Sequence, residues 1–172
     1  MMRKAGLALA LLLLLTGCRA KASEPVEFVE DGAGAALSEP YQIVFGVPQD
    51  AVQTVMAEDS AVEVYEAANG DYRIVTEIME ATSVEEAIEA VSGMPADELT
   101  VLKLQRFPMP EYHFAWSSSN EEGETVSRAA LIAAEDHYYV MTMTEKAGLG
   151  ETYRDVATQV FSTFGLTTYD LV

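Results

Sequence analysis

The dipeptide Asn69-Gly70 separates two runs of β-forming residues, Ala61 to Ala67 and Tyr72 to Ala81. Asparagine and glycine both accept the positive φ angles of a two-residue hairpin turn, which makes this pattern the strongest short-range hairpin signal. We therefore predict two antiparallel strands joined by a tight turn. The polar side chains that alternation along these strands directs toward water are Glu63, Arg73 and Glu77.

Further strand-forming runs lie before and after this hairpin, and most are bounded by turn residues. The predicted strands are Tyr41 to Val47, Leu99 to Phe107, Glu111 to Ser118, Thr125 to Ala134 and Tyr138 to Thr144. Gln49 to Asp59 is ambiguous, because Val52, Val55 and Met56 have helical spacing in a short segment. We expect a weak helix or an ordered loop there. The last residues, Leu166 to Val172, are expected to form a tail or a short edge strand.

Two segments carry the apolar periodicity of amphipathic helices. The first begins after Ser83, a credible N-cap residue, with Glu86 at the third helical position as in a capping box. Gly93 is expected to end this helix in the left-handed conformation. The second helix covers about Glu151 to Phe164. Its apolar stripe consists of Tyr153, Val156, Ala157, Val160, Phe161 and Phe164.

The order of these elements favours an α+β fold. Hairpins dominate and β-α-β alternation does not recur, so we predict a twisted antiparallel sheet of about six strands with helices packed on it. Residues 41–172 are numerous enough to bury a real core and are expected to form a single domain. Apolar packing alone must stabilise that domain, since Cys18 is the only cysteine and no disulfide can form within it.

From Tyr41 onward, the order of elements resembles the PsbP-like fold. The resemblance lies in Asp136-His137-Tyr138-Tyr139-Val140, a loop, and a helix that ends in Phe161-Ser162-Thr163-Phe164-Gly165-Leu166. It implies an antiparallel sheet packed between helices, with the last strand pair leading into a C-terminal helix. The common thread among proteins of this fold is accessory protein–protein binding. The resemblance therefore implies a binding role rather than catalysis, and it carries over no site residues.

The N-terminal residues have the pattern of an export signal. Arg3 and Lys4 precede an unbroken apolar run, Ala5 to Leu15, which at ~1.5 Å per helical residue spans about half of a ~30 Å hydrocarbon core. This run is too short for a membrane span and fits a signal peptide. Leu15-Thr16-Gly17-Cys18, at the end of the run, resembles the lipobox of bacterial lipoproteins.

That second resemblance implies that residues 1–17 are a signal peptide and that Cys18 is the site of lipid attachment. Residues 18–40, rich in Ala, Gly, Ser and acidic side chains, are then a flexible tether. The domain would be held at the cell membrane on its extracytoplasmic side, because two acyl chains on one residue anchor a protein firmly. The alternative is an ordinary secretory signal with an incidental cysteine.

The chain is strongly acidic, with 28 Asp and Glu against 10 Lys and Arg and a net charge of −18. A surface of this sign repels phosphate polymers, so nucleic acid is not an expected partner. The charge suits solubility at a crowded surface. The alternative explanation of the charge is that the protein binds a divalent cation. Oxygen ligands for such a cation are available in a predicted turn, from Glu121, Glu122 and Glu124 beside Asn120.

His113 and His137 are the only histidines. His113 shares one face of a predicted strand with Glu111 and Ser117, so a hydrolase constellation can be drawn. Residues two apart on a strand lie about 6.5–7 Å from each other, however, which is too far for a direct hydrogen bond. We therefore predict no catalytic residues, no metal site and no cofactor. His137 lies in a predicted turn, where a polar role is expected.

Tyr112, Phe114 and Trp116 occupy the other face of that strand. Such an aromatic stripe forms either a ligand platform or part of a core. The second predicted helix offers a matching apolar face in Tyr153, Phe161 and Phe164, so we expect the stripe to face that helix and Trp116 to be mostly buried.

The leading hypothesis is thus a non-enzymatic, lipid-anchored accessory module that binds a protein partner through one sheet face or through the loop end around Phe107 to Pro110. The second is a solute- or metal-binding lipoprotein with a pocket between sheet and helix, and a hydrolase is the third. An apolar gap between sheet and helix would favour the solute-binding hypothesis. A packed core with an exposed apolar patch would favour the protein partner.

Overall fold

The computed structural model of the 172-residue chain describes residues 41–54, 62–105, 108–121, 123–134 and 137–168. The expected signal peptide, the lipid-attachment residue Cys18 and the expected tether lie outside these residues, as does Phe107. Among the helices of the described part, none has the length and apolar character of a membrane span.

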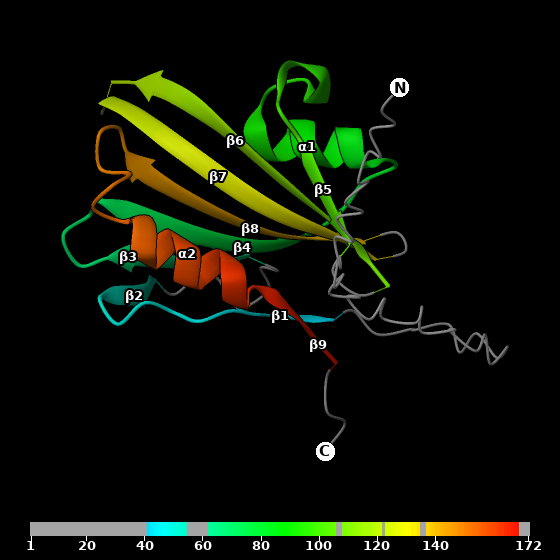
Figure 1. Cartoon of the computed structure of the whole chain (residues 1–172), viewed down its shortest axis with the longest axis horizontal. Helices are drawn as coiled ribbons and strands as arrows, with labels where there is room; N and C mark the ends of the chain where they lie inside the picture. Colours follow the sequence, from blue (N-terminus) through cyan, green and yellow to red (C-terminus); the bar gives the residue numbers. More distant parts are fainter. Residues whose placement is uncertain (1–40, 55–61, 106–107, 122, 135–136, 169–172) are drawn as a thin grey trace, which may run out of the picture. The chain divides into compact units, whose positions relative to one another are not determined.

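An antiparallel sheet of seven strands forms the body of the structure, in the spatial order β2-β3-β4-β8-β7-β6-β5 (Figure 1). The α+β class with an antiparallel sheet is therefore confirmed, with seven strands where about six were expected. The strands of this sheet are β2 (Ala51–Thr54), β3 (Val62–Ala67), β4 (Tyr72–Glu80), β5 (Leu102–Gln105), β6 (Pro110–Asn120), β7 (Gly123–Ala134) and β8 (His137–Lys146). The other elements are β1 (Gln42–Val44), α1 (Val84–Ser92), the short 3-10 helix η1 (Ala96–Glu98), α2 (Arg154–Thr163) and β9 (Gly165–Thr167).

The Asn69-Gly70 hairpin is confirmed, since β3 and β4 pair antiparallel on either side of it and Gly70 has φ of 70°. The expected exposure of Glu77 is wrong. Glu77 is half-buried, because it shares a face of β4 with Met79, and Met79 packs into the apolar cluster beneath α1. This burial raises the pKa of the Glu77 carboxyl above its ordinary value.

The expectation of a weak helix or a loop at Gln49 to Asp59 is also wrong for the part that the structure describes. Ala51–Thr54 forms strand β2, which pairs with β3 along the edge of the sheet. Helical spacing of three apolar residues is a weak signal when a neighbouring strand offers unpaired backbone groups and the segment contains β-branched residues. Val52 is 63% exposed, so the helical spacing of the apolar residues in this segment does not correspond to a buried helix face.

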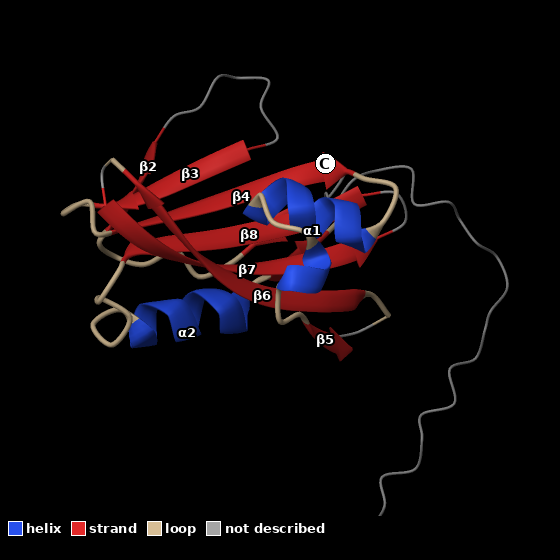
Figure 2. Ribbon diagram, turned by 90° about the horizontal axis from the view of Figure 1, so that it is seen from above, coloured by secondary structure: helices blue, strands red, loops and turns tan. Residues whose placement is uncertain are grey.

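The two α-helices cover opposite faces of the sheet (Figure 2). Ala130 and Ile132 of β7 pack in the cluster that contains α2, whereas their neighbours Ala129 and Leu131 pack in the cluster that contains α1. Successive side chains of a strand point to opposite faces, so β7 contributes to two cores at once. Both faces of the central strands are therefore buried.

The helix that covers the aromatic stripe of β6 is not the predicted one. Phe114 is buried and stacks on Trp116 at a ring-centroid distance of 5.6 Å, within the cluster beneath α1 rather than beneath α2. Trp116 is half-buried rather than mostly buried. Both helices have an apolar stripe, and the stripe alone does not specify which face of the sheet each of them covers.

Helix α1 has the predicted ends. The Ser83 hydroxyl accepts a hydrogen bond from the Glu86 N–H at 3.2 Å, and Gly93 adopts φ of 72° beyond the last turn. The Glu86 carboxylate accepts hydrogen bonds from the hydroxyl and the N–H of Thr82. In a capping box the donor would be the N–H of the N-cap residue itself, Ser83, so the bond is displaced by one residue. These bonds lower the pKa of the Glu86 carboxyl.

A tail or a short edge strand was expected from Leu166 onward, and the described residues there form the short strand β9. Strand β9 pairs antiparallel with β1 and makes a separate two-stranded sheet. Ile43 and Leu166, which face each other in this pair, pack against the cluster that contains α2. The N–H of Tyr41 donates a hydrogen bond to the Tyr139 hydroxyl at 2.8 Å, which fixes the start of the described chain to β8.

Candidate functional site

A cleft of about 490 Å³ lies between α2 and the strands β5, β6 and β7. Ligand sites for small organic molecules usually have volumes of about 300–1,000 Å³, so this cleft has the size of such a site. Its lining is mostly apolar. The lining residues are Thr100, Leu102, His113, Phe114, Ala115, Arg128, Ala129, Arg154, Ala157, Thr158 and Phe161.

The cleft exists because α2 packs over the centre of the sheet and leaves its β5 edge uncovered. The helix residues Ala157 and Val160 are buried in one cluster with Ile74 of β4 and Met141 of β8. Toward β5, the small side chain of Ala115 leaves room beside the helix. Leu102 of β5 forms the rim of the cleft and is 60% exposed.

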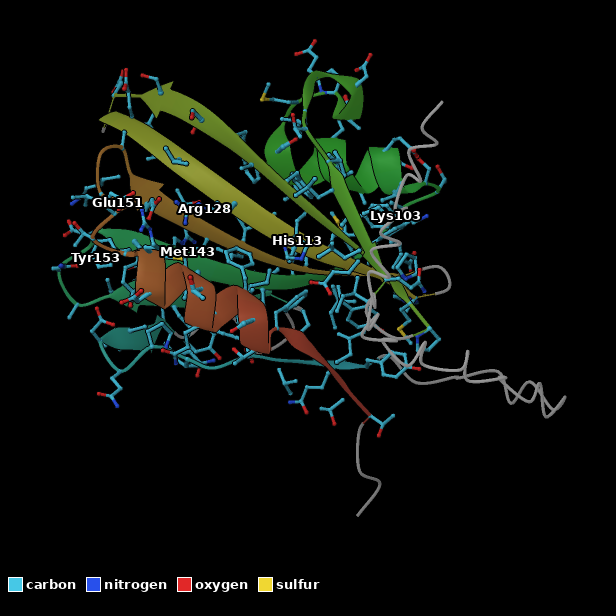
Figure 3. The ribbon with its side chains drawn as sticks, in the orientation of Figure 1. Lys103, His113, Arg128, Met143, Glu151 and Tyr153 are labelled. Atoms are coloured by element: carbon cyan, nitrogen blue, oxygen red, sulfur yellow. The ribbon has the colours of Figure 1, made fainter. Side chains whose placement is uncertain are left out.

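Two arginine side chains line the cleft, which is unusual for a chain this acidic. Arg128 of β7 and Arg154 of α2 both line it, and no Asp or Glu does. Figure 3 shows Arg128 on the sheet, with Glu151 near the start of α2. The described part of the chain contains few cationic side chains: Arg73, Lys103, Arg128, Lys146 and Arg154. Two of these five therefore meet at a single cleft in a chain of net charge −18.

Arg128 is held in place by an ion pair with Glu145, a buried residue of the neighbouring strand β8. The distance between an Arg128 guanidinium nitrogen and Glu145 Oε1 is 2.7 Å, and Glu145 is 4% exposed. The other oxygen of Glu145, Oε2, is buried without a hydrogen-bond partner in the described residues. A Cβ at Gly150 would lie 3.3 Å from Glu145 Oε1, so a glycine at this position leaves room for the ion pair.

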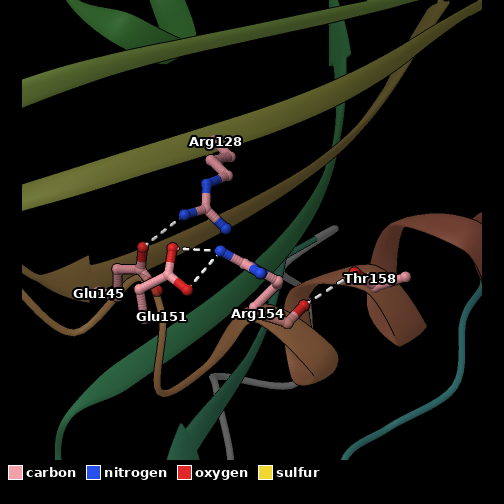
Figure 4. A network of polar contacts seen from close by, with 5 residues as sticks. All are labelled: Arg128, Glu145, Glu151, Arg154 and Thr158. Atoms are coloured by element: carbon pink, nitrogen blue, oxygen red, sulfur yellow. Dashed lines mark hydrogen bonds and ion pairs between the residues drawn. The ribbon is translucent and has the colours of Figure 1, made fainter.

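Arg154 has a looser partner at the surface. Its guanidinium forms an ion pair with both carboxylate oxygens of Glu151, three residues earlier, and the two side chains are 65% and 82% exposed (Figure 4). The backbone carbonyl of Arg154 accepts a hydrogen bond from the Thr158 hydroxyl at 2.8 Å. The two arginine side chains reach toward each other, with the carboxylates of Glu145 and Glu151 beside them (Figure 4).

The start of α2 is fastened to the β3–β4 turn. The Tyr153 hydroxyl donates a hydrogen bond to the Asp71 carboxylate at 3.0 Å and accepts one from the Asn69 side-chain amide at 2.9 Å. Lys146 donates a hydrogen bond to the same carboxylate. The hydrogen bond from Lys146, followed by that from Tyr153, lowers the pKa of Asp71. These contacts place Arg154, the next residue, at one end of the cleft.

His113 and Glu111 contact each other directly, which corrects the prediction that they are too far apart. The distance from His113 Nε2 to Glu111 Oε1 is 2.6 Å, and Glu111 is 1% exposed. The expected spacing applies to backbone positions, whereas the two side chains lean along the strand toward each other. The His113 ring lies 6.1 Å from that of Phe161, so it belongs to the wall between β6 and α2.

The remaining candidate residues are not brought together with this pair. Ser117, the third member of the imagined hydrolase, does not line the cleft. His137 lies 3.7 Å from Glu80 at the surface. Glu121 and Glu124 are exposed and Glu122 lies outside the described residues, within which no group of three His, Cys, Asp or Glu side chains could hold a metal ion.

Sequence reasoning missed Arg128 and Arg154. The available signal was the scarcity of positive charge in an acidic chain, which gives each remaining arginine more weight. The pairing of the two could not be inferred, because they lie on different elements, 26 positions apart.

No protein-family model matches the sequence, and no curated protein matches it. Solved structures are similar in fold. The chain is similar to the solution structure of cyanobacterial PsbP from Synechocystis sp. PCC 6803, with a TM-score of 0.52 and 11% identity over 78% of this chain and 97% of that one. This likeness supports the PsbP-like fold and, at such low identity, the fold alone.

Two further structures are similar at the same level. One is a protein of Bacteroides thetaiotaomicron, with a TM-score of 0.50 and 10% identity over 74% of this chain, and the match spans 46% of that protein. The other is LpqN, described as involved in cell envelope biogenesis of Mycobacterium tuberculosis, with a TM-score of 0.49 and 12% identity over 76% of this chain and 87% of that one.

Proposed function

We propose that this chain is a lipid-anchored binding module on the extracytoplasmic side of the cell membrane, and that it holds a small ligand in the cleft beside α2. The observation that carries the proposal is the cleft itself, which has the volume of a small-molecule site and a mostly apolar lining. An apolar gap between sheet and helix is the feature that distinguishes a solute-binding module from one with a fully packed core.

The polar groups of the cleft suit binding better than catalysis. A guanidinium group donates hydrogen bonds and has no acceptor, so Arg128 and Arg154 can orient a ligand but do not act as a base. His113 is hydrogen-bonded to Glu111, and Ser117 is not at the cleft. A hydrolase would need a nucleophile within hydrogen-bond reach of such a base.

Filling the cleft tests the proposal. Ala115 lines the cleft from β6, and an Ala115→Phe variant would place an aromatic ring in the space that a ligand would occupy. We expect it to weaken the binding of the uncharged fluorescent probe N-phenyl-1-naphthylamine about tenfold or more, because the steric clash excludes the probe. Fluorescence titration of the purified chain measures this affinity.

Ser119→Phe is the matched control for this experiment. Ser119 lies on the same face of β6, four residues further along and outside the cleft, so the added ring is the same and its place is different. Circular dichroism should show the same fold for both variants. Equal probe affinity in Ala115→Phe and the unaltered chain would rule out the cleft as the binding site.

The anchor is tested separately at Cys18. A Cys18→Ala variant should be released from the membrane or remain unprocessed, because the thioether to the diacylglycerol cannot form and each buried acyl CH₂ would otherwise contribute about 0.8 kcal/mol. Cell fractionation with high-salt and carbonate washes, followed by immunoblotting, reports the outcome. If the variant stays as membrane-bound as the unaltered protein, the proposed anchor is wrong.

A protein partner is the second candidate. Leu102 and Leu104 of the edge strand β5 are 60% and 46% exposed and lie on one face of that strand. Exposed apolar side chains on an edge strand suit β-strand addition by a partner. Photocrosslinking from a probe placed at Leu104 in the anchored protein would favour this candidate if it traps a protein and Ala115→Phe does not reduce the yield.

A further inference from the structure

We propose that the ligand of the cleft is a small amphipathic anion whose carboxylate is received by Arg128 and Arg154 and whose apolar body lies along Leu102, Ala115 and Phe161. This inference rests on the proposed small-ligand function. It adds the charge and the orientation of the ligand. It also implies that, in the free protein, the Glu151 carboxylate occupies the Arg154 guanidinium that the ligand carboxylate would bind.

The sign of the charge follows from the lining. The lining includes two guanidinium groups and no Asp or Glu, although the chain as a whole carries a net charge of −18. The carboxylates that pair with them, Glu145 and Glu151, are not among the lining residues. A cationic ligand would find only hydrogen-bond donors on these two side chains. An arginine presents five N–H donors in a planar fork that matches the two oxygens of a carboxylate.

Arg128 is the fixed half of the anion site. Glu145 engages one of its nitrogens from the buried side, which orients the guanidinium before any ligand arrives. In the described part of the chain, the Arg128 side chain makes this one hydrogen bond, so further guanidinium N–H donors can bind a ligand. A donor that is held in place loses less conformational entropy on binding.

Arg154 is the movable half. Its ion pair with Glu151 lies at the surface, where such pairs contribute little to stability because water screens the charges. A ligand carboxylate between Arg128 and Arg154 can therefore replace that of Glu151 at small cost. Arg128 comes from the sheet and Arg154 from α2, and the two side chains reach toward each other, as this exchange requires (Figure 4).

The apolar half of the ligand has its own place. Phe161 lies two turns further along α2 than Arg154, on the side of the cleft where its ring faces that of His113. Ala115 and Leu102 line the same region from β6 and β5. The polar end of the ligand thus lies at the start of α2 and its apolar body points toward the end of the helix.

Three probes with one phenylbutyl body and different head groups test the charge. The dissociation constants of phenylbutyrate, phenylbutanol and phenylbutylamine are measured by NMR titration of the whole chain. We expect the acid to bind about tenfold or more tightly than the alcohol, which is the range of a charge-assisted hydrogen bond, and the amine to bind more weakly than both.

Matched charge variants test the residues. Glu151→Gln should tighten the binding of phenylbutyrate about threefold or more, because it removes the competing carboxylate, and Arg154→Gln should weaken it about tenfold. The controls are Glu66→Gln and Arg73→Gln, which remove the same charges from an exposed ion pair on β3 and β4, outside the cleft. Neither control should change the affinity more than twofold.

The tightening by Glu151→Gln is the decisive result, since loss of folding cannot increase affinity. Equal affinities for the acid and the alcohol, no binding of the acid, or no response to Glu151→Gln and Arg154→Gln would each overturn the inference. The proposed small-ligand function stands in those cases if Ala115→Phe still weakens binding of the fluorescent probe about tenfold or more, and it fails on its own if that variant has no effect.

Discussion

Replacing Leu131 by alanine should lower the free energy of unfolding by about 2–5 kcal/mol, the usual cost of truncating a fully buried leucine. Leu131 lies in the middle of β7 with no exposed surface and packs in the cluster beneath α1. The truncation removes apolar contacts and leaves a cavity that a rigid sheet cannot close. Urea denaturation monitored by circular dichroism measures the loss, at pH 7 and with the slope of the transition compared between the two proteins.

Leu102→Ala is the control for Leu131→Ala, because it makes the same chemical change in the same sheet. Leu102 is 60% exposed at the rim of the cleft, so its truncation should change the stability by less than about 0.5 kcal/mol. A comparable loss in both variants would mean that burial does not account for the difference. A small loss in Leu131→Ala would contradict the burial of the α1 face of the sheet.

Replacing Arg128 by methionine should cost about 3 kcal/mol of stability, because the buried carboxylate of Glu145 then loses its cation. The cost is the penalty for an uncompensated buried charge rather than the net contribution of the ion pair. Thermal and urea denaturation of the variant measure it. Arg73→Met provides a comparison, since Arg73 and Glu66 are both 53% exposed and lie 3.7 Å apart, and little change is expected there.

The double variant Arg128→Met with Glu145→Gln separates these two contributions. It removes the cation and the buried charge together, so it should recover most of the stability that Arg128→Met loses. If the double variant is as unstable as the single one, the loss arises from packing of the Arg128 side chain. That result would contradict the view that the ion pair with Glu145 stabilises the orientation of Arg128.

The cleft offers one physical reason why a chain this acidic would retain two arginines close together. Glu145 and Glu151 each pair with one of the two guanidinium groups, so neither arginine lacks a counter-charge in the free protein. The arrangement leaves the arginine donors on the open side, where a ligand can reach them. If the proposed ligand binds, both stability and binding should depend on Arg128, whereas Glu151 should affect binding alone.

The sequence alone determined the elements whose signals are local. Asn69-Gly70 specified the β3–β4 hairpin because only a few residues accept its turn geometry, and Ser83 with Gly93 specified the ends of α1 for the same kind of reason. The alternation of β6 predicted which side chains share a face, and the antiparallel α+β class followed from the succession of hairpins. The order of elements also indicated the PsbP-like fold, which the similar solved structures support.

Only the tertiary structure decided which helix covers which face, and with it the site. Phe114 packs beneath α1 and the opposite face of β6 borders α2, a choice that the apolar stripes of the helices leave open. The contact between His113 and Glu111 and the approach of Arg128 to Arg154 depend on side-chain directions and on packing between distant segments. The periodicity of a sequence shows which side of a helix or strand is apolar. Which other element packs against that side depends on the packing of the whole chain.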